Sequence, residues 1–138
     1  LAAAPDSTVL EIGTGSGYQA AVLGRLAKHV YTIEIVPELA SWSAGVLKKY
    51  PNVTPRLGDG YKGWPERAPF DRIILTAAPP EIPKALIDQL KPGGRLVAPV
   101  GRSVWEQELV VIDKAADGKP SRRSVLPVRF VPMVPGKK

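Results

Sequence analysis

Short apolar runs alternate with longer segments of mixed polarity along most of the chain. Each run has five or six residues, is built mainly from Val, Ile and Leu, and is soon followed by Gly or Pro. Runs of this length and composition predict buried β-strands. We expect strands at Thr8–Ile12, Val30–Ile35, Val53–Leu57, Phe70–Leu75 and Arg95–Val100.

The segments between these runs have the period of amphipathic helices. We expect helices at about residues 16–28, 37–50 and 82–89, with Pro37 at the first position of the second helix. In the first helix the inward stripe is predicted to hold Tyr18, Ala21, Val22 and Arg25 or Leu26. In the second helix one face is predicted to hold Leu39, Trp42 and Val46, with Trp42 in the core or filling a groove.

Two further strand-like segments, Trp105–Asp113 and Ser121–Val131, flank the turn residues Asp117-Gly118 and predict a hairpin. The order of the elements predicts a three-layer α/β fold, in which helices cover a mostly parallel sheet and an antiparallel hairpin ends it. Pro55 lacks a backbone N–H, which places the third strand at an edge. The length of 138 residues indicates a single domain, residues 1–138.

The first strand leads into a turn with three alternate glycines, Glu11-Ile12-Gly13-Thr14-Gly15-Ser16-Gly17. Such a turn lets the backbone approach a ligand, and the helix that follows offers unpaired N–H groups. Tyr18 breaks the dinucleotide fingerprint, which needs a small residue at that position. The spacing instead resembles motif I of the class I S-adenosylmethionine methyltransferases, and the Glu11 carboxylate suits a cofactor that carries an ammonium and a sulfonium.

Two later strand ends carry acidic residues where a doubly wound sheet binds its ligands. Glu34 ends the second strand and is predicted to accept hydrogen bonds from the ribose hydroxyls. Asp59 and Gly60 follow the third strand and are predicted to meet the adenine. Tyr61 and Trp64 come next, and they either pack under this loop or cover the adenine.

The amino-acid composition excludes several kinds of catalytic and metal site. The chain has no Cys and one His, His29, which excludes thiolate sites and leaves little for a histidine metal site, so we expect no metal. The loop Thr76-Ala77-Ala78-Pro79-Pro80 should face the reacting atoms, yet it contains no general base, nucleophile or metal ligand.

The net charge of +6 favours anionic partners, but the basic residues form no long run. No apolar stretch reaches the ~18 residues of a membrane span.

Several motifs together resemble the protein-L-isoaspartate O-methyltransferase family over nearly the whole chain. They are Val9-Leu10-Glu11-Ile12-Gly13-Thr14-Gly15-Ser16-Gly17-Tyr18, Gly58-Asp59-Gly60-Tyr61-Lys62-Gly63-Trp64, Thr76-Ala77-Ala78-Pro79, Leu90-Lys91-Pro92-Gly93-Gly94 and Val128-Arg129-Phe130-Val131-Pro132. The resemblance implies a Rossmann-like fold and methyl transfer from S-adenosylmethionine to the free carboxylate of isoaspartyl residues in damaged proteins. The ester then closes to a succinimide, which can reopen to normal aspartate.

The resemblance also implies residue roles. The cofactor would be held by Glu11, Gly13, Thr14, Gly15, Ser16, Gly17, Glu34, Asp59 and Gly60. The peptide groove would be bordered by Ala77, Ala78, Pro79, Phe130 and Val131. Family members carry a serine in a Ser-x-Pro segment that would lie before Leu1, so we expect no catalytic side chain within these residues and little activity from them alone. We expect isoaspartyl proteins and peptides as partners, no nucleic acid, a monomer, and a cytoplasmic location.

Three other classes of function compete with this interpretation. A nucleic-acid methyltransferase would suit the positive charge, but a polar-Pro-Pro-aromatic motif is typical after its fourth strand, where this chain has Thr76-Ala77-Ala78-Pro79. A non-catalytic binding module with the same fold is the second alternative. An NAD oxidoreductase is the third, and Tyr18 and the lack of an acid/base pair argue against it.

Overall fold

The computed structural model describes residues 5–103 and 105–136. It contains a seven-stranded sheet in the order β3-β2-β1-β4-β5-β6-β7. The strands are β1 (Thr8–Ile12), β2 (His29–Glu34), β3 (Val53–Leu57), β4 (Phe70–Leu75), β5 (Leu90–Val100), β6 (Gln107–Lys114) and β7 (Pro120–Val128). The first five strands pair in parallel, and β6 and β7 are antiparallel. The predicted α/β class, the edge position of Pro55 and the terminal hairpin are confirmed.

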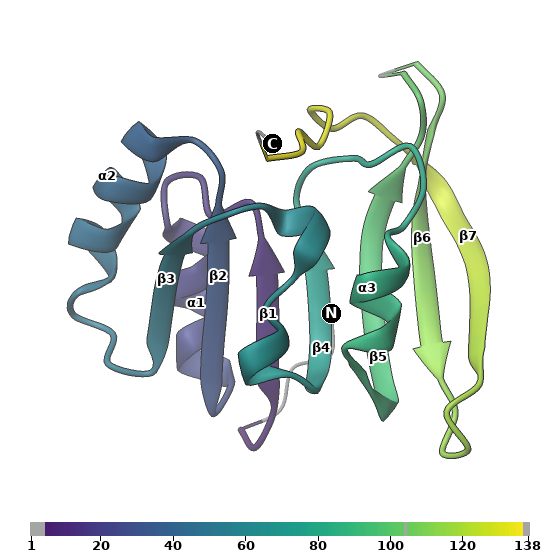
Figure 1. The fold of residues 1–138 in the computed structure, drawn as a ribbon, viewed down its shortest axis with the longest axis horizontal. Coiled ribbons are helices and arrows are strands. Elements are labelled where there is room, and N and C mark those ends of the chain that lie inside the picture. The colour runs from purple at the N-terminus through teal and green to yellow at the C-terminus, as the bar shows by residue number, and fades with distance from the viewer. Residues whose placement is uncertain (1–4, 104, 137–138) are drawn as a thin grey trace.

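Helices cover both faces of this sheet (Figure 1). The helices are α1 (Tyr18–Leu26), α2 (Pro37–Leu47) and α3 (Lys84–Asp88), with two short 3₁₀ turns, η1 (Gly60–Lys62) and η2 (Pro65–Arg67). α1 and α2 pack on one face and α3 on the other, so each face has its own apolar core. Successive side chains of β1 point to opposite faces of the sheet and so contribute to both cores. Val9 faces α1, while Leu10 and Ile12 face the opposite side.

The inward stripe predicted for the first helix is wrong except at Ala21, which packs against the core on this face. Tyr18 is 76% exposed and Leu26 is 53% exposed, while the buried residues of α1 are Ala20 and Leu23. A close approach between α1 and the sheet explains this, because small alanine side chains leave room for the helix to lie near β1 and β2. Trp42 is likewise 66% exposed rather than in the core, and α2 buries Ser43 and Leu47 instead.

Strand β5 begins at Leu90, ahead of its predicted start at Arg95. A shift in register between Phe70 and Arg72 accommodates the extra residues, so the strand bends rather than ends there. Trp64 packs into the core beneath its loop rather than over the cavity. The centroids of the Trp64 and Tyr31 rings lie 5.2 Å apart in an edge-to-face arrangement. Among the described residues no helix is long and apolar enough to cross a membrane.

The segment that follows β7 turns back across the carboxyl ends of the parallel strands (Figure 1). It pairs with Ala78, in the loop after β4, through a parallel bridge at Pro132. This return brings residues 131–136 next to the turn after β1 and the loop after β3. The upper edge of the sheet therefore combines residues from both ends of the sequence.

Candidate cofactor and substrate site

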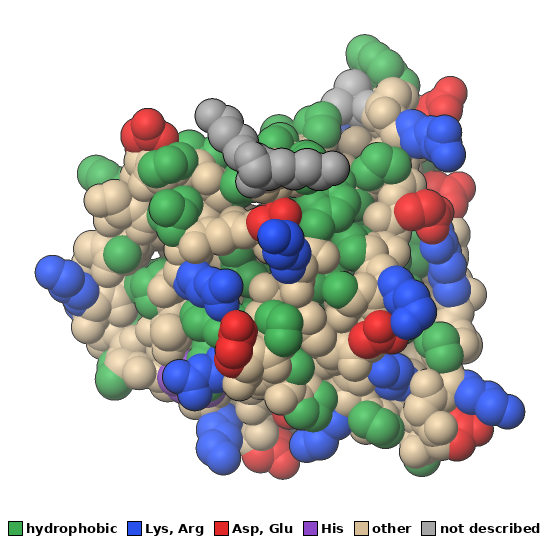
Figure 2. Space-filling model, viewed as in Figure 1, with side chains coloured by type: hydrophobic (Ala, Val, Ile, Leu, Met, Phe, Trp, Pro, Cys, Tyr) green, Lys and Arg blue, Asp and Glu red, His purple; other side chains and the backbone are tan. Residues whose placement is uncertain are grey.

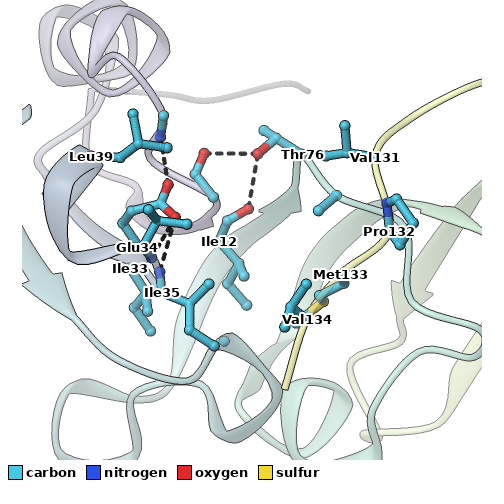
Figure 3. A pocket seen from close by; sticks show the side chains of 15 residues that line it. Ile12, Ile33, Glu34, Ile35, Leu39, Thr76, Val131, Pro132, Met133 and Val134 are labelled. Atoms are coloured by element: carbon cyan, nitrogen blue, oxygen red, sulfur yellow. Dashed lines mark hydrogen bonds between the residues drawn. The ribbon is translucent and has the colours of Figure 1, made fainter. Parts of the chain in front are cut away.

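A cavity of about 550 Å³ lies at the carboxyl ends of β1, β2 and β4. Its size falls in the range of small-molecule sites, and its position is the switch point where ligands bind in doubly wound sheets. The wall is mostly apolar and comes from several elements (Figure 3). The cavity is lined by Ile12, Gly13, Gly15, Ile33, Glu34, Ile35, Val36, Leu39, Gly60, Thr76, Ala77, Val131, Pro132, Met133 and Val134.

The glycine turn after β1 forms the floor of this cavity. Gly13, Gly15 and Gly17 all have positive φ angles of 100°, 56° and 89°, which side chains rarely tolerate. No atom lies within 4 Å of the point where a Cβ on Gly15 would stand, so the backbone is open to the cavity there. The turn is held from below by Thr76, whose hydroxyl lies 2.7 Å from the Gly13 carbonyl oxygen.

Glu34 presents its carboxylate at one side of the cavity and is almost completely buried. Its Oε1 accepts a hydrogen bond from Gly15 N–H at 2.8 Å, and its Oε2 accepts from Ile35 and Val36 N–H at 3.0 and 3.1 Å. These bonds tie the glycine turn to the end of β2 (Figure 3). Since a carboxylate has about four acceptor positions, one remains for a ligand hydroxyl.

Glu11 lies one layer deeper than the cavity and is fully buried. Thr32 Oγ1 donates to Glu11 Oε1 at 2.5 Å, and Thr32 in turn shares a hydrogen bond of 2.6 Å with Thr14. Glu11 Oε2 has no hydrogen-bond partner among the described residues. Burial raises the pKa of Glu11 to about 7; the Thr32 hydrogen bond lowers it in part, and the Glu34 charge adds to the rise.

The structure brings only some of the predicted cofactor and groove residues to the cavity. Those that line it are Gly13, Gly15, Glu34, Gly60, Ala77 and Val131. Those that do not are Glu11, Thr14, Ser16, Gly17, Asp59, Ala78, Pro79 and Phe130. Half of the second group support the cavity: Thr14 and Gly17 are buried in the turn, and Ala78 and Pro79 form backbone hydrogen bonds behind it.

Asp59 sits at the margin of the cavity and caps η1, accepting from Tyr61 N–H at 2.9 Å. Gly136 lies against it, because a Cβ on Gly136 would stand 3.0 Å from the Asp59 Cβ. Ser16 is exposed at the tip of the glycine turn. Asp59 and Ser16 therefore lie in loops whose neighbouring residues line the cavity, but their own side chains do not line it.

Sequence reasoning missed much of the cavity wall. Ile35, Val36 and Leu39 follow β2, and their position at a strand's carboxyl end was a usable signal. Pro132, Met133 and Val134 carry no such signal, because only the return of the chain after β7 brings them to the cavity. In the described part of the chain, no group of three His, Cys, Asp or Glu side chains is arranged to hold a metal ion.

The sheet order and the position of the cavity define the class of Rossmann-like methyltransferases. The family model for protein-L-isoaspartate(D-aspartate) O-methyltransferase matches residues 1–138. The chain therefore belongs to the protein-L-isoaspartate O-methyltransferase family.

Relatives with known names agree with this assignment. Protein-L-isoaspartate O-methyltransferase 1 of Nitrosospira multiformis is 55% identical over 130 residues, which are 93% of this chain and 55% of the relative. A solved protein-L-isoaspartate O-methyltransferase superimposes with a TM-score of 0.86 at 31% identity, over 94% of this chain and 42% of that one. The chain thus spans about half the length of the curated relatives it matches.

A second solved structure comes from Plasmodium falciparum and is described as a β-aspartate methyltransferase in complex with S-adenosyl-L-homocysteine. It superimposes with a TM-score of 0.80 at 23% identity, over 95% of this chain and 67% of that one. At this level of identity the match supports the fold.

Proposed function

We propose that the protein transfers a methyl group from S-adenosylmethionine to the free carboxylate of isoaspartyl residues in damaged proteins. The membership of the family supports this activity, and so do the names of the relatives. The observation that carries the proposal is the meeting of Glu34 and the open glycine turn in one apolar cavity at the switch point of the sheet.

The residues around the cavity fit the cofactor. Gly13 and Gly15 would let its methionine end lie on the backbone, while Glu34 would accept from a ribose hydroxyl. Ile35, Val36 and Gly60 would border the adenine ring, with Asp59 at the margin. When bound, the cofactor supplies an electrophilic methyl group on a sulfonium.

The protein needs no general base for this reaction. A free carboxyl of the kind found in isoaspartate has a pKa of about 3.3–4.3, so the nucleophile is already ionised at pH 7. The task of the protein is to align the two reactants, which can supply about 7–11 kcal/mol. The apolar wall of Ala77 and Val131 would exclude water while the opposite charges of carboxylate and sulfonium neutralise each other.

A titration with S-adenosylhomocysteine tests the cofactor assignment. Glu34→Ala removes the ribose acceptor and should weaken binding about tenfold to a hundredfold, since hydrogen bonds to charged groups contribute about 1.5–3 kcal/mol. Glu38→Ala is the matched control, because Glu38 is an exposed acid in the first turn of α2 and does not line the cavity. Equal affinity of the wild-type and Glu34→Ala proteins would remove Glu34 from the site.

A further inference from the structure

One wall of the cavity is formed by the segment Phe130–Val134, which we call the wall segment. Four of its residues, Val131 to Val134, line the cavity opposite Glu34 and Leu39 (Figure 3). The segment lies outside the helices and strands, apart from the single bridge at Pro132. Its distance from Glu34 therefore depends on a few specific contacts.

The middle and the end of the wall segment are fixed by the backbone of Ala78 and by the hydroxyl group of Tyr61. Ala78 N–H donates to the Val131 carbonyl oxygen at 2.8 Å, and Met133 N–H donates to the Ala78 carbonyl oxygen at 2.9 Å. Tyr61 Oη donates to the Met133 carbonyl oxygen at 3.1 Å. These contacts connect the segment to the loops after β4 and β3.

The beginning of the wall segment is fixed by a side chain, Gln107. The last pair of the β6–β7 ladder joins Gln107 to Val128, and β7 leaves the sheet after it. Beyond that point Phe130 N–H donates to Gln107 Oε1 at 2.7 Å, and Gln107 Nε2 donates to the Phe130 carbonyl oxygen at 2.9 Å. The Gln107 amide thus replaces the missing strand partner, with its donor and its acceptor both used.

Gln107 is itself held tightly, with 3% of its surface exposed. A Cβ on Gly101 would clash with the Glu106 carbonyl oxygen and would stand 2.8 Å from both Cα and Cγ of Gln107. Glycine at position 101 therefore lets the backbone at Glu106 and Gln107 lie this close, with the Gln107 side chain beside it. Gly101 N–H donates to the Pro79 carbonyl oxygen at 3.0 Å. Gly101 therefore links Gln107 to the loop after β4, which borders the cavity.

We propose that Gln107 is a positioning residue that holds the wall segment at its working distance from Glu34 and thereby sets how tightly the cavity binds its ligand. The choice of S-adenosylhomocysteine as the ligand rests on the proposed function, whereas the contact between Gln107 and Phe130 does not. A glutamine suits this task because the backbone of Phe130 needs one donor and one acceptor from the same planar group.

The substitution Gln107→Glu separates this role from simple space filling. An ionised carboxylate has the same shape but no donor, so it would face the Phe130 carbonyl oxygen with an unpaired negative charge. A protonated carboxyl has one donor and one acceptor and restores both bonds. Burial raises the pKa of a carboxyl. The charged groups around this position are the exposed side chains of Glu81, Arg102, Glu106 and Glu108. Two further cations lie nearby: Arg129, 4.4 Å from the Trp105 ring centroid, and Arg122, which is paired with Glu81.

The first experiment measures affinity for S-adenosylhomocysteine at pH 8 and pH 5.5. Gln107→Glu should bind at least tenfold more weakly than wild type at pH 8, the equivalent of about 1.4 kcal/mol, and within about threefold of wild type at pH 5.5. Glu108→Gln, an exposed change of charge on the same strand, should match wild type at both values. An unchanged affinity at pH 8, or a loss of equal size at both pH values, overturns the proposal.

The second experiment needs no ligand. Gln107→Ala removes both hydrogen bonds without adding a charge, so the Met133 amide should exchange with deuterium at least tenfold faster than in wild type. The Ile112 amide, inside the β5–β6 ladder, is the control and should keep its rate. An unchanged exchange rate of the Met133 amide in Gln107→Ala contradicts the role of Gln107, even if Gln107→Glu does not fold. Failure of the wild-type protein to bind S-adenosylhomocysteine would contradict only the proposed function.

Discussion

At the scale of single residues, Glu11 is the most unusual group in the described chain. It lies fully buried under the glycine turn, with one carboxylate oxygen bonded to Thr32 and the other unpaired among the described residues. Loss of hydration is the main reason that its pKa rises to about 7, and the nearby Glu34 charge acts in the same direction. The folded protein therefore holds a proton on Glu11 more tightly than the unfolded chain does.

This difference makes the free energy of unfolding depend on pH. Because the pKa is raised on folding, the contribution of Glu11 is fully present below about pH 4.5 and is lost as the pH rises through about 7. Glu11→Gln keeps the acceptor for Thr32 and removes the titration. Its stability relative to wild type should increase by about 3 kcal/mol in total between pH 4.5 and values well above 7.

Urea unfolding of both proteins at pH 5 and pH 8 measures the larger part of this change. A difference in stability between the two proteins that is the same at both pH values would show that Glu11 titrates as it does in the unfolded chain. The sequence identifies Glu11 as the acid of the glycine motif, but its full burial depends on the position of β1 between β2 and β4, which no local pattern reports.

At the scale of elements, the orientation of α1 decides which of its residues stabilise the fold. Leu23 is buried between the helix and the sheet, while Leu26 is 53% exposed on the outer side. Leu23→Ala should therefore destabilise the protein by about 2–4 kcal/mol, and Leu26→Ala by less than about 1 kcal/mol. The two leucines are a matched pair, since the same atoms are removed from the same helix.

Urea or thermal unfolding of the two variants compares them directly. Equal losses of stability, or a larger loss for Leu26→Ala, would contradict the observed orientation of the helix. The pattern of large apolar residues predicted the opposite face, because Tyr18, Val22 and Leu26 are more conspicuous than Ala20 and Ala27. Close packing on a sheet favours small residues, so apolar size and burial do not coincide in this helix.

The strands were predicted far better than the helix faces. A strand buried on both sides is apolar at nearly every position, so its sequence is distinct without knowledge of its neighbours. β1 and β4 carry this signal in Val9-Leu10 and in Ile73-Ile74-Leu75, although β4 also holds the half-buried Asp71 and Arg72. Their predicted ranges agree with the observed ones. Glu34 was found because a polar residue that ends such a strand must lie at the edge where ligands bind.

At the scale of the whole molecule, the cavity depends on a contact between distant parts of the chain. Ala78 and the wall segment meet only because the chain returns across the ends of the strands after β7. No periodicity in the sequence specifies this return, so Met133 and Val134 were not foreseen. The basic residues were visible from the start, but on the face in Figure 2 they are interspersed with acidic ones rather than gathered in one patch.

The most direct test of the proposed activity is a comparison of two peptides that differ in one linkage. The whole protein is incubated with S-adenosylmethionine carrying a labelled methyl group and with a peptide containing either isoaspartate or normal aspartate. We predict that the isoaspartyl peptide acquires a label that mild base releases as methanol, as expected for a methyl ester, and that the aspartyl peptide does not. Equal labelling of both peptides, or no labelling of the isoaspartyl peptide by protein that binds the cofactor, would contradict the proposed function.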